Sequence, residues 1–429
     1  MKKKTSITEG AVYCTVSCFF LVLFLSTVGL ESTFCSAQEW NQWKGARRDN
    51  KSTCSDLNFE WGAQGPTLLW QVHGLGEGYS NISFSKDKIF TMGNLGESAC
   101  LIALERSSGK RLWTCPTGPS SGVGYPGPRC TPASDGKLVW GMDQHSNLIC
   151  CDAQTGKKVW QKNFVEDLDG QLQMYAGIES WGFAESPLLL GKYLYCTPGG
   201  DKGAVVALDK TTGDVVWRAT DLKDRCAYAS IVPAVIDKVA QLLCVTDKRL
   251  TGLDFRTGKT LWSVEYSGPG VMACDPVYEK GVLFITCAYR TGAFGYRIEK
   301  TESGFDVKEA YRLQRIDNKH HGVIVQNGYV YSSTERRQLI CIDIQTGDIK
   351  WTKDRMNGGK TSLTYAEGRI IARGEDGTIT VVEANPNEYR EIASFMQPNR
   401  SNCNAWTYPV IVDGKMYLRD QDSLFCYKL

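Results

Sequence analysis

Side chains that can bind a ligand or move a proton occur in short segments spread along the whole chain. Two carboxylates, Glu185 and Asp275, could each act as a general base, and Arg129 or Lys360 could hold an anionic oxygen. Aromatic residues lie near several of these groups in the sequence, and two of the four histidines, His320 and His321, are adjacent to each other. The full candidate set for ligand binding is Tyr79, Arg129, Trp181, Glu185, Tyr228, His320, His321, Lys360, Tyr365 and Trp406.

A repeated phrase predicts the elements that would bring these side chains together. An alternating apolar run leads to an acidic residue, then Thr-Gly or Ser-Gly, then a second apolar run that closes on tryptophan. This pattern predicts strand, tight turn, strand, because the acidic residue can accept hydrogen bonds from turn amides and glycine adopts positive φ without a Cβ clash. The five copies end at Trp113, Trp160, Trp217, Trp262 and Trp351.

The spacing of the copies predicts a closed ring of repeats. Successive tryptophans lie 47, 57, 45 and 89 positions apart, and degenerate copies end near Tyr311 and Phe395. Another pair of strands is expected before each hairpin, and four strands in about 45 residues is the period of a propeller blade. We therefore expect an all-β, eight-bladed β-propeller of four-stranded antiparallel blades. Residues 66–72 would complete the last blade, 406–429, and so remove the exposed sheet edges.

The first residues predict export from the cytoplasm. Basic residues precede an apolar run, and small residues around Ser36 form a plausible cleavage site, so 1–37 is interpreted as a signal peptide. The alternative is an uncleaved anchor, because an apolar run of about 20 residues can span a bilayer. We expect an N-terminal extension at 38–65, a propeller at 66–429, and a periplasmic or secreted monomer that touches a membrane only through an uncleaved segment.

Composition excludes several other classes of protein. The net charge of +2 shows no footprint for nucleic acid. Of 17 cysteines, 14 follow Gln38, an even number that an oxidising compartment could pair. The opposing interpretation is that most are reduced core residues, because Cys150 and Cys151 occupy repeat positions held elsewhere by small or apolar residues. No metal site is predicted, and the local motifs of hydrolases, nucleotide-binding loops and calcium loops are absent from the sequence.

The repeat resembles the pyrroloquinoline-quinone (PQQ) enzyme repeat, which is found in quinoprotein alcohol dehydrogenases and in the outer-membrane assembly lipoprotein BamB. The whole string is similar to secreted PQQ-like propeller proteins of planctomycete-type bacteria. The resemblance implies that the repeat tryptophans pack between neighbouring blades. It rests on the repeats and on EWNQWKGARRDN, GEGYS (76–80), GYPGPRCTP (124–132), WGFAESPL (181–188), NKHHG (318–322), KTSLTYAEGR (360–369) and YLRDQDSLFCY (417–427).

Three hypotheses for function follow. The first is a non-catalytic binding or scaffold module that holds a protein or a small ligand at its channel face or loops. The second, by fold analogy, is an oxidoreductase with PQQ and Ca²⁺, in which Glu185 or Asp275 would be the base and Arg129 or Lys360 the partner of a quinone oxygen. The third is envelope assembly work like that of BamB. The candidate residues could also do no more than fill a narrow channel.

The adjacent histidines carry a geometric expectation of their own. Neighbouring strand residues point to opposite faces, so at most one of His320 and His321 should face the channel. Without a bulge the two rings cannot both bind one ion there.

Overall fold

The computed structural model describes residues 40–429 except 121–123, 176–177, 180 and 267–271. The chain divides into one unit of residues 1–36 and a second of residues 37–429, and all the strands described here belong to the second. The predicted signal peptide or anchor therefore lies outside the described residues. Within the described ranges, no helix is long and apolar enough to cross a membrane.

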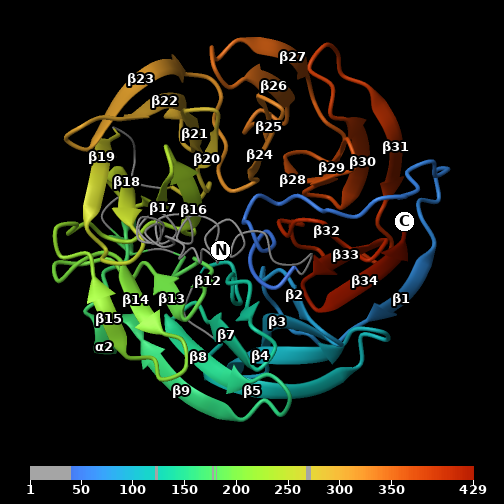
Figure 1. The fold of residues 1–429 in the computed structure, drawn as a ribbon. Coiled ribbons are helices and arrows are strands. Elements are labelled where there is room, and N and C mark those ends of the chain that lie inside the picture. Colours follow the sequence, from blue (N-terminus) through green and yellow to red (C-terminus); the bar gives the residue numbers. More distant parts are fainter. Residues whose placement is uncertain (1–39, 121–123, 176–177, 180, 267–271) are drawn as a thin grey trace, which may run out of the picture. The chain divides into compact units, whose positions relative to one another are not determined.

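Eight four-stranded antiparallel sheets stand around one axis, which confirms the predicted eight-bladed propeller. In seven blades the strands pair in chain order from the axis outward (Figure 1). Blades one to four contain β2 (Ser83–Ser85), β3 (Lys88–Leu95), β4 (Ser98–Glu105) and β5 (Arg111–Pro119); β6 (Ala133–Ser134), β7 (Leu138–Met142), β8 (Asn147–Asp152) and β9 (Lys158–Asn163); β12 (Leu188–Leu190), β13 (Tyr193–Cys196), β14 (Val206–Asp209) and β15 (Val215–Arg218); and β16 (Val232–Ile236), β17 (Val239–Val245), β18 (Arg249–Asp254) and β19 (Thr260–Glu265).

The last blade closes the ring in the predicted way. Strand β1 comes from the N-terminal side of the propeller and pairs with β34, with Trp70 opposite Cys426 and Val72 opposite Leu424. Blades five to eight contain β20 (Val277–Glu279), β21 (Val282–Cys287), β22 (Gly292–Lys300) and β23 (Phe305–Leu313); β24 (Val323–Gln326), β25 (Tyr329–Ser333), β26 (Leu339–Asp343) and β27 (Ile349–Lys353); β28 (Thr361–Ala366), β29 (Arg369–Gly374), β30 (Thr378–Glu383) and β31 (Glu391–Met396); and β32 (Val410–Val412), β33 (Lys415–Asp420), β34 (Ser423–Lys428) and β1 (Leu68–Val72).

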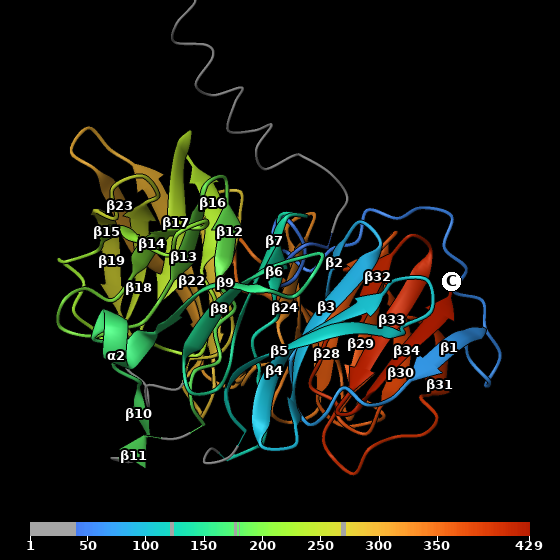
Figure 2. The ribbon, with the colours of Figure 1, turned by 90° about the horizontal axis from the view of Figure 1, so that it is seen from below.

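The insertion that stretches one repeat lies in the connection between β9 and β12. It begins with the short helix α2 (Phe164–Leu168), whose first amides are capped by the Asn163 side chain. The small hairpin of β10 (Met174–Tyr175) and β11 (Ile178–Glu179) follows and projects from one side of the ring (Figure 2). The connection therefore extends the side of the propeller on which Trp181 lies.

The hairpin turns form as their residue types predict. The Asp152 carboxylate accepts hydrogen bonds from the Gln154 and Thr155 amides and from the Thr155 hydroxyl. These bonds, the Thr155 hydroxyl first among them, lower the pKa of Asp152. Gly156 follows at φ +73°, in the region that side chains with a Cβ disfavour. The predicted local chemistry of the repeat is confirmed at this turn.

The closing tryptophans lie between blades. The Trp113 ring packs on Gly156 of the next blade, where an added Cβ would lie 2.6 Å from the ring, and its Nε1 donates to the Ala153 carbonyl. Trp160 and Trp217 pack in the same way on Gly213 and Gly258. In the degenerate copy Tyr311 takes this place: it packs on Gly347 and donates its hydroxyl to the Ile344 carbonyl.

Two of the repeat tryptophans pack differently. Trp351 donates to the Asn385 carbonyl of the next blade, which lacks the Thr-Gly turn. Trp262 donates instead to Gln241 Oε1 in its own blade, at 2.7 Å. The blade after Trp262 has the longer hairpin of β22 and β23, with Lys300 opposite Phe305, in place of the repeated tight turn.

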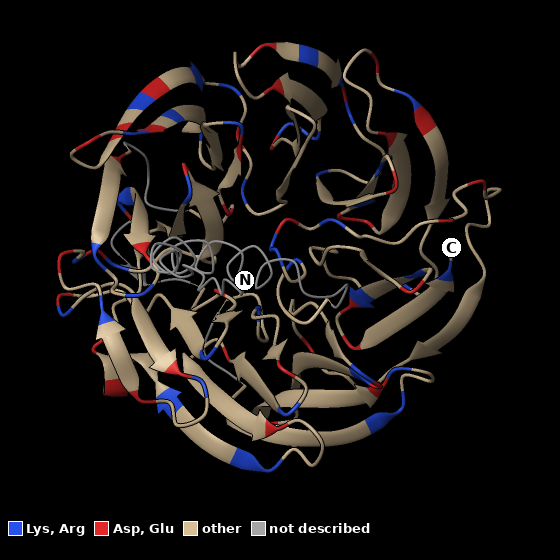
Figure 3. Cartoon of the chain, in the orientation of Figure 1, with Lys and Arg blue, Asp and Glu red and all other residues tan. Residues whose placement is uncertain are grey.

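The fourteen described cysteines carry free thiols, and twelve of them are buried. Cys150 and Cys151 lie in β8 with no exposed surface, inside a cluster that spans the first three blades. The interpretation of these two thiols as core side chains is confirmed. Charged residues of both signs are distributed over the outer strands and turns of the ring (Figure 3).

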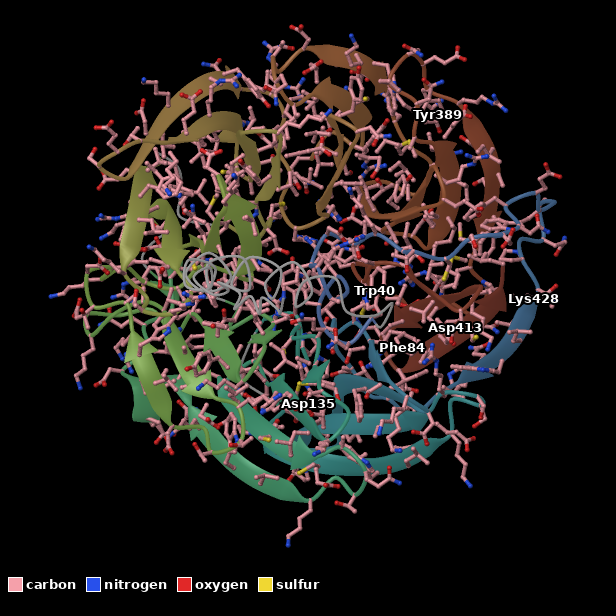
Figure 4. All side chains as sticks on the ribbon, viewed as in Figure 1. Trp40, Phe84, Asp135, Tyr389, Asp413 and Lys428 are labelled. Carbon is pink, nitrogen blue, oxygen red and sulfur yellow. The ribbon has the colours of Figure 1, made fainter. Side chains whose placement is uncertain are left out.

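The N-terminal extension does more than lead into the propeller. Residues 40–52, called the plug segment below, contact the inner part of every blade, and Figure 1 shows the blue segment running from the centre of the ring to its rim. Figure 4 places the labelled Trp40 beside Phe84, toward the axis from the rim residues Tyr389 and Lys428. The Trp40 carbonyl accepts the Phe84 amide at 2.7 Å. The plug segment thus fills one end of the channel.

The contacts of the plug segment reach each blade in turn around the ring, although not in the order of the segment's own residues. From the second blade to the eighth they are Asn41 with Ser134, Gln42 with Leu189, Arg48 with Ile231, Lys44 with Asp275, Lys51 with Gln326, and Ser52 with both Tyr365 and Ile411. Positive φ at Lys44, Gly45, Arg48 and Asn50 lets the short segment turn within the ring.

Candidate functional site

The other end of the channel holds a pocket of about 280 Å³, called the channel-mouth pocket below. Each of the eight connections that lead to a first strand supplies at least one lining residue, and the plug segment supplies its Trp43. The lining residues are Trp43, Tyr79, Tyr125, Arg129, Trp181, Ala184, Tyr228, Ala273, Lys319, His320, Lys360, Glu375, Asn404, Trp406 and Tyr408.

Trp406 is the centre of an aromatic wall in this pocket. Its ring lies 4.7 Å from Tyr79, 5.1 Å from Tyr125 and 4.6 Å from His320, measured between ring centroids. The three rings are inclined to Trp406 by 32°, 58° and 70°, so the wall offers ring edges as well as faces. Trp181 and Tyr228 form a second aromatic pair, 5.9 Å apart. A flat apolar group can enter such a wall with favourable edge-to-face contacts.

Three cations and one carboxylate line the same pocket. The Arg129 guanidinium donates to the carbonyls of Gly124, Tyr125 and Gly127, which fixes its position within its own loop. Burial lowers the pKa of Arg129 to about 10, so the group stays charged at neutral pH. Lys319 lies over the Tyr289 ring. Together these groups leave an excess of positive charge at the channel mouth.

The single carboxylate of the pocket is already engaged. Glu375 Oε1 accepts Trp406 Nε1 at 3.1 Å and lies 3.4 Å from Lys360 Nζ. Lys360 also contacts Glu335 at 3.4 Å. Glu375 is therefore held within the protein by a cation and an indole N–H.

The two histidines do not divide by strand alternation, because both lie in a bend before β24 and their ring centroids are only 4.2 Å apart. His320 lines the pocket, and its Nε2 has no hydrogen-bond partner within the described part of the chain. Burial, together with Lys360 and Lys319, lowers the pKa of His320 to about 3, so the ring is neutral and can accept or donate one hydrogen bond to a ligand. His321 is 1% exposed, and burial lowers its pKa well below the usual value. It lies behind the wall.

Besides His321, three predicted site residues lie outside the channel-mouth pocket. Asp275 is buried and accepts Lys44 Nζ at 2.7 Å, Trp43 Nε1 at 2.8 Å and the Ser230 amide at 2.8 Å. It anchors the plug segment. Tyr365 lies at the opposite end of the channel, where its carbonyl accepts the Ser52 amide and its ring faces Lys51.

Glu185 is the third of these residues. It is 2% exposed, and Oε1 accepts the Thr197 amide at 2.6 Å while Oε2 has no partner among the described residues. Burial raises its pKa to about 7, against the opposing effect of the Thr197 bonds and of Arg48. Neither Glu185 nor Asp275 lines the pocket, so neither is placed to take a proton from a ligand held there.

Sequence reasoning missed several lining residues. Trp43, Tyr125 and Lys319 lie inside or beside the conspicuous motifs EWNQWKGARRDN, GYPGPRCTP and NKHHG, so attention to the complete motifs could have found them. Glu375 carries no such signal. It lies in the turn between the second and third strands of its blade, and only the folded ring brings that turn to the channel mouth.

The residues present do not fit PQQ with Ca²⁺. Calcium takes six to eight oxygen ligands, with carboxylates prominent among them. The pocket has one carboxylate, which is bound to Lys360 and Trp406. In the described ranges, His, Cys, Asp and Glu residues form no group of three or more that could hold a metal ion. We therefore derive no reaction step through this cofactor.

A ring of eight four-stranded blades with the repeated Asp-x-x-Thr-Gly turn and interblade tryptophans defines a PQQ-like β-propeller. The chain belongs to the family described as outer membrane protein assembly factor BamB, whose model matches residues 97–297 and 300–387. The narrower likeness to the planctomycete group stays a prediction.

Among curated proteins, BamB of Yersinia pestis is 23% identical over 72% of this chain and 77% of its own length. The tetrathionate hydrolase of Acidithiobacillus ferrooxidans is 24% identical over 74% of this chain, but the match spans only 53% of that enzyme. These names indicate the range of functions within the wider group of relatives.

Solved structures share the fold at low identity. BamB from Moraxella catarrhalis is 15% identical, with a TM-score of 0.59 over 85% of this chain and 97% of that one. The quinohemoprotein alcohol dehydrogenase of Comamonas testosteroni is 13% identical, with a TM-score of 0.67 over 94% and 82%. At such identities the likeness establishes the fold alone.

Proposed function

We propose that the protein is a non-catalytic binding module of the cell envelope that holds a ligand in the channel-mouth pocket. One observation carries this proposal: loops from all eight blades converge on an aromatic, positively charged pocket, and the one carboxylate among its described lining residues is already paired. Such a pocket can recognise a ligand, but it offers no poised general base.

The pocket also limits the kind of ligand. A volume of about 280 Å³ is at the small end of ligand pockets, so it suits one ring or one side chain rather than a large cofactor. The inclined rings favour a flat apolar group, and Arg129, Lys319 and Lys360 favour a negative charge close to it. We therefore expect a small aromatic acid to be a suitable probe.

An envelope location is supported by the names of the relatives. Three of the matched curated proteins are described as outer membrane protein assembly factors. The predicted signal peptide favours the same compartment. We propose export to the periplasm or beyond, which can be tested by fractionating cells and sequencing the N-terminus of the purified protein.

The binding test uses N-acetylphenylalanine, because its ring does not mask tryptophan fluorescence. Saturable quenching of the protein, weakened in Trp406→Ala, is the expected result. Parallel titrations use PQQ with and without Ca²⁺, and a dye-linked assay follows alcohol oxidation. Calcium-dependent PQQ binding coupled to dye reduction would overturn the non-catalytic assignment, and the absence of any response to the aromatic acid would overturn the pocket's role.

A further inference from the structure

A second concave surface adjoins the channel-mouth pocket. It is an open groove of about 880 Å³, called the basic groove below, and the two surfaces share Lys319. Its lining comes from the turns after β21 and β25 and from the connection between β23 and β24. The basic groove is therefore continuous with the pocket and lies on the same side of the propeller.

The charges of the basic groove are strongly biased. It is lined by five basic residues, four of them arginines, and by two acidic residues, a net charge of +3 in a chain whose total is +2. One of the two acids, Glu335, already contacts Lys360, and the other, Asp317, accepts the Arg290 amide. Positive charge is thus concentrated in the groove, whereas the charges of the remaining residues nearly cancel one another.

Three of the arginines have guanidinium groups without a partner among the residues that the structure describes. Arg290, Arg315 and Arg336 are exposed, and no hydrogen bond or ion pair engages their guanidinium groups within the described residues. The fourth, Arg312, is by contrast paired with Glu309 and covers the Phe294 ring. Free guanidinium groups beside a groove suit carboxylates, which they can bind with two parallel hydrogen bonds.

The shape of the adjoining pocket favours a peptide as the occupant. A sugar ring stacks best on one flat platform, whereas the rings around Trp406 are inclined by 32° to 70° and enclose the group that enters. An inserted aromatic side chain meets such walls edge to face. Aromatic anchors in a central pocket surrounded by charged contacts are typical of peptide and protein recognition.

We propose that this face binds an acidic peptide segment of a partner protein, with one aromatic side chain in the channel-mouth pocket and its carboxylates on Arg290, Arg315 and Arg336. This inference rests on the proposed binding function and names the class of its partner. Lys319, which borders both surfaces, lies where the peptide would pass from the groove into the pocket.

The test measures fluorescence anisotropy of a dye-labelled acidic peptide with one phenylalanine. We expect saturable binding that weakens with salt, and a loss of at least about tenfold in affinity in the triple variant R290A/R315A/R336A. The matched control is K110A/K157A/K259A, which also removes three exposed positive charges but at hairpin turns away from the groove. The control should change the affinity by less than about twofold.

Further binding measurements distinguish this inference from its alternatives. Replacing the phenylalanine of the peptide by alanine should weaken binding, and equal binding would remove the pocket from the proposal. An equal loss in both triple variants would show non-specific attraction and overturn it. Tighter binding of polygalacturonate than of the peptide would assign the face to an anionic glycan instead.

The small probe tests ligand binding in the pocket separately from peptide binding on the whole face. N-acetylphenylalanine should bind the wild type and R290A/R315A/R336A alike, because none of the three arginines lines the pocket. If this probe binds and the peptide does not, the partner assignment fails while the binding function stands. If the probe itself does not bind, the proposed function fails as well.

Discussion

The two halves of the central channel are built from the same eight blades, but the plug segment fills one half whereas the other half contains a pocket. In one half the plug segment supplies a donor or acceptor to every blade, and Asp275 has partners on both oxygens. In the other half Trp406 and His320 border a pocket, and His320 Nε2 has no partner among the described residues. Satisfied buried polar groups stabilise a fold, whereas unsatisfied groups in a concave site are available for a ligand.

This comparison also separates two kinds of charged residue. Lys44 and Asp275 are almost fully buried and belong to the plugged half. Arg129 and Lys360 border the open half and line the pocket. The carboxylates that looked most suited to catalysis in the sequence are thus structural, and the candidates for recognition are mostly cations and rings.

The largest effect is expected where the plugged half would lose a charge. Lys44→Met leaves the Asp275 carboxylate buried without its cation, so we expect the free energy of unfolding to fall by about 3–5 kcal/mol. Chemical denaturation measures the change. The double variant Lys44→Met with Asp275→Asn should recover much of the loss, and a single variant as stable as the wild type would show that the plug is not held by this pair.

Glu185 gives the next largest effect, and it depends on pH. Its pKa is raised from 4.5 to about 7, so the folded state holds a proton that the unfolded chain releases. Stability should therefore fall by roughly 3 kcal/mol as the pH rises from about 4.5 to about 7, and Glu185→Gln should remove this component. Denaturation at several pH values measures it. An unchanged pH profile in Glu185→Gln would contradict the assignment.

In the open half, Trp406→Ala should affect binding more than stability. The ring contacts Tyr79, Tyr125 and His320 and is only half-buried, so its removal opens the pocket without emptying a closed core. We expect affinity for N-acetylphenylalanine to fall at least about tenfold, with a smaller loss of stability than in Lys44→Met. A larger loss of stability in Trp406→Ala than in Lys44→Met would contradict the distinction between a structural half and a binding half.

The smallest effect is expected at Tyr365. It was a candidate for ligand binding, but its hydroxyl accepts the Gly368 amide at the plugged end. Tyr365→Phe should therefore leave probe affinity unchanged and cost at most about 1 kcal/mol of stability. Fluorescence titration checks this, and a clear loss of affinity would place Tyr365 in the site after all.

The repeated phrase was sufficient to predict the fold because it acts locally. Asp152 and Gly156 form their turn from neighbouring backbone groups, and alternation of apolar residues predicts the strands around it. Trp262 shows the limit of this reasoning. It has the same phrase as the other copies, yet it bonds within its own blade because the next hairpin is longer.

Local residue patterns were sufficient to predict the strands, the tight turns, the number of blades and most of the segments at the channel mouth. Which side chains border a pocket depends on how the closed ring packs. Asp275 and Glu375 are both acidic, but the plug segment covers the first, whereas the turn between β29 and β30 of the seventh blade places the second at the channel mouth. Closing a ring brings together residues hundreds of positions apart, and local patterns carry no record of such contacts.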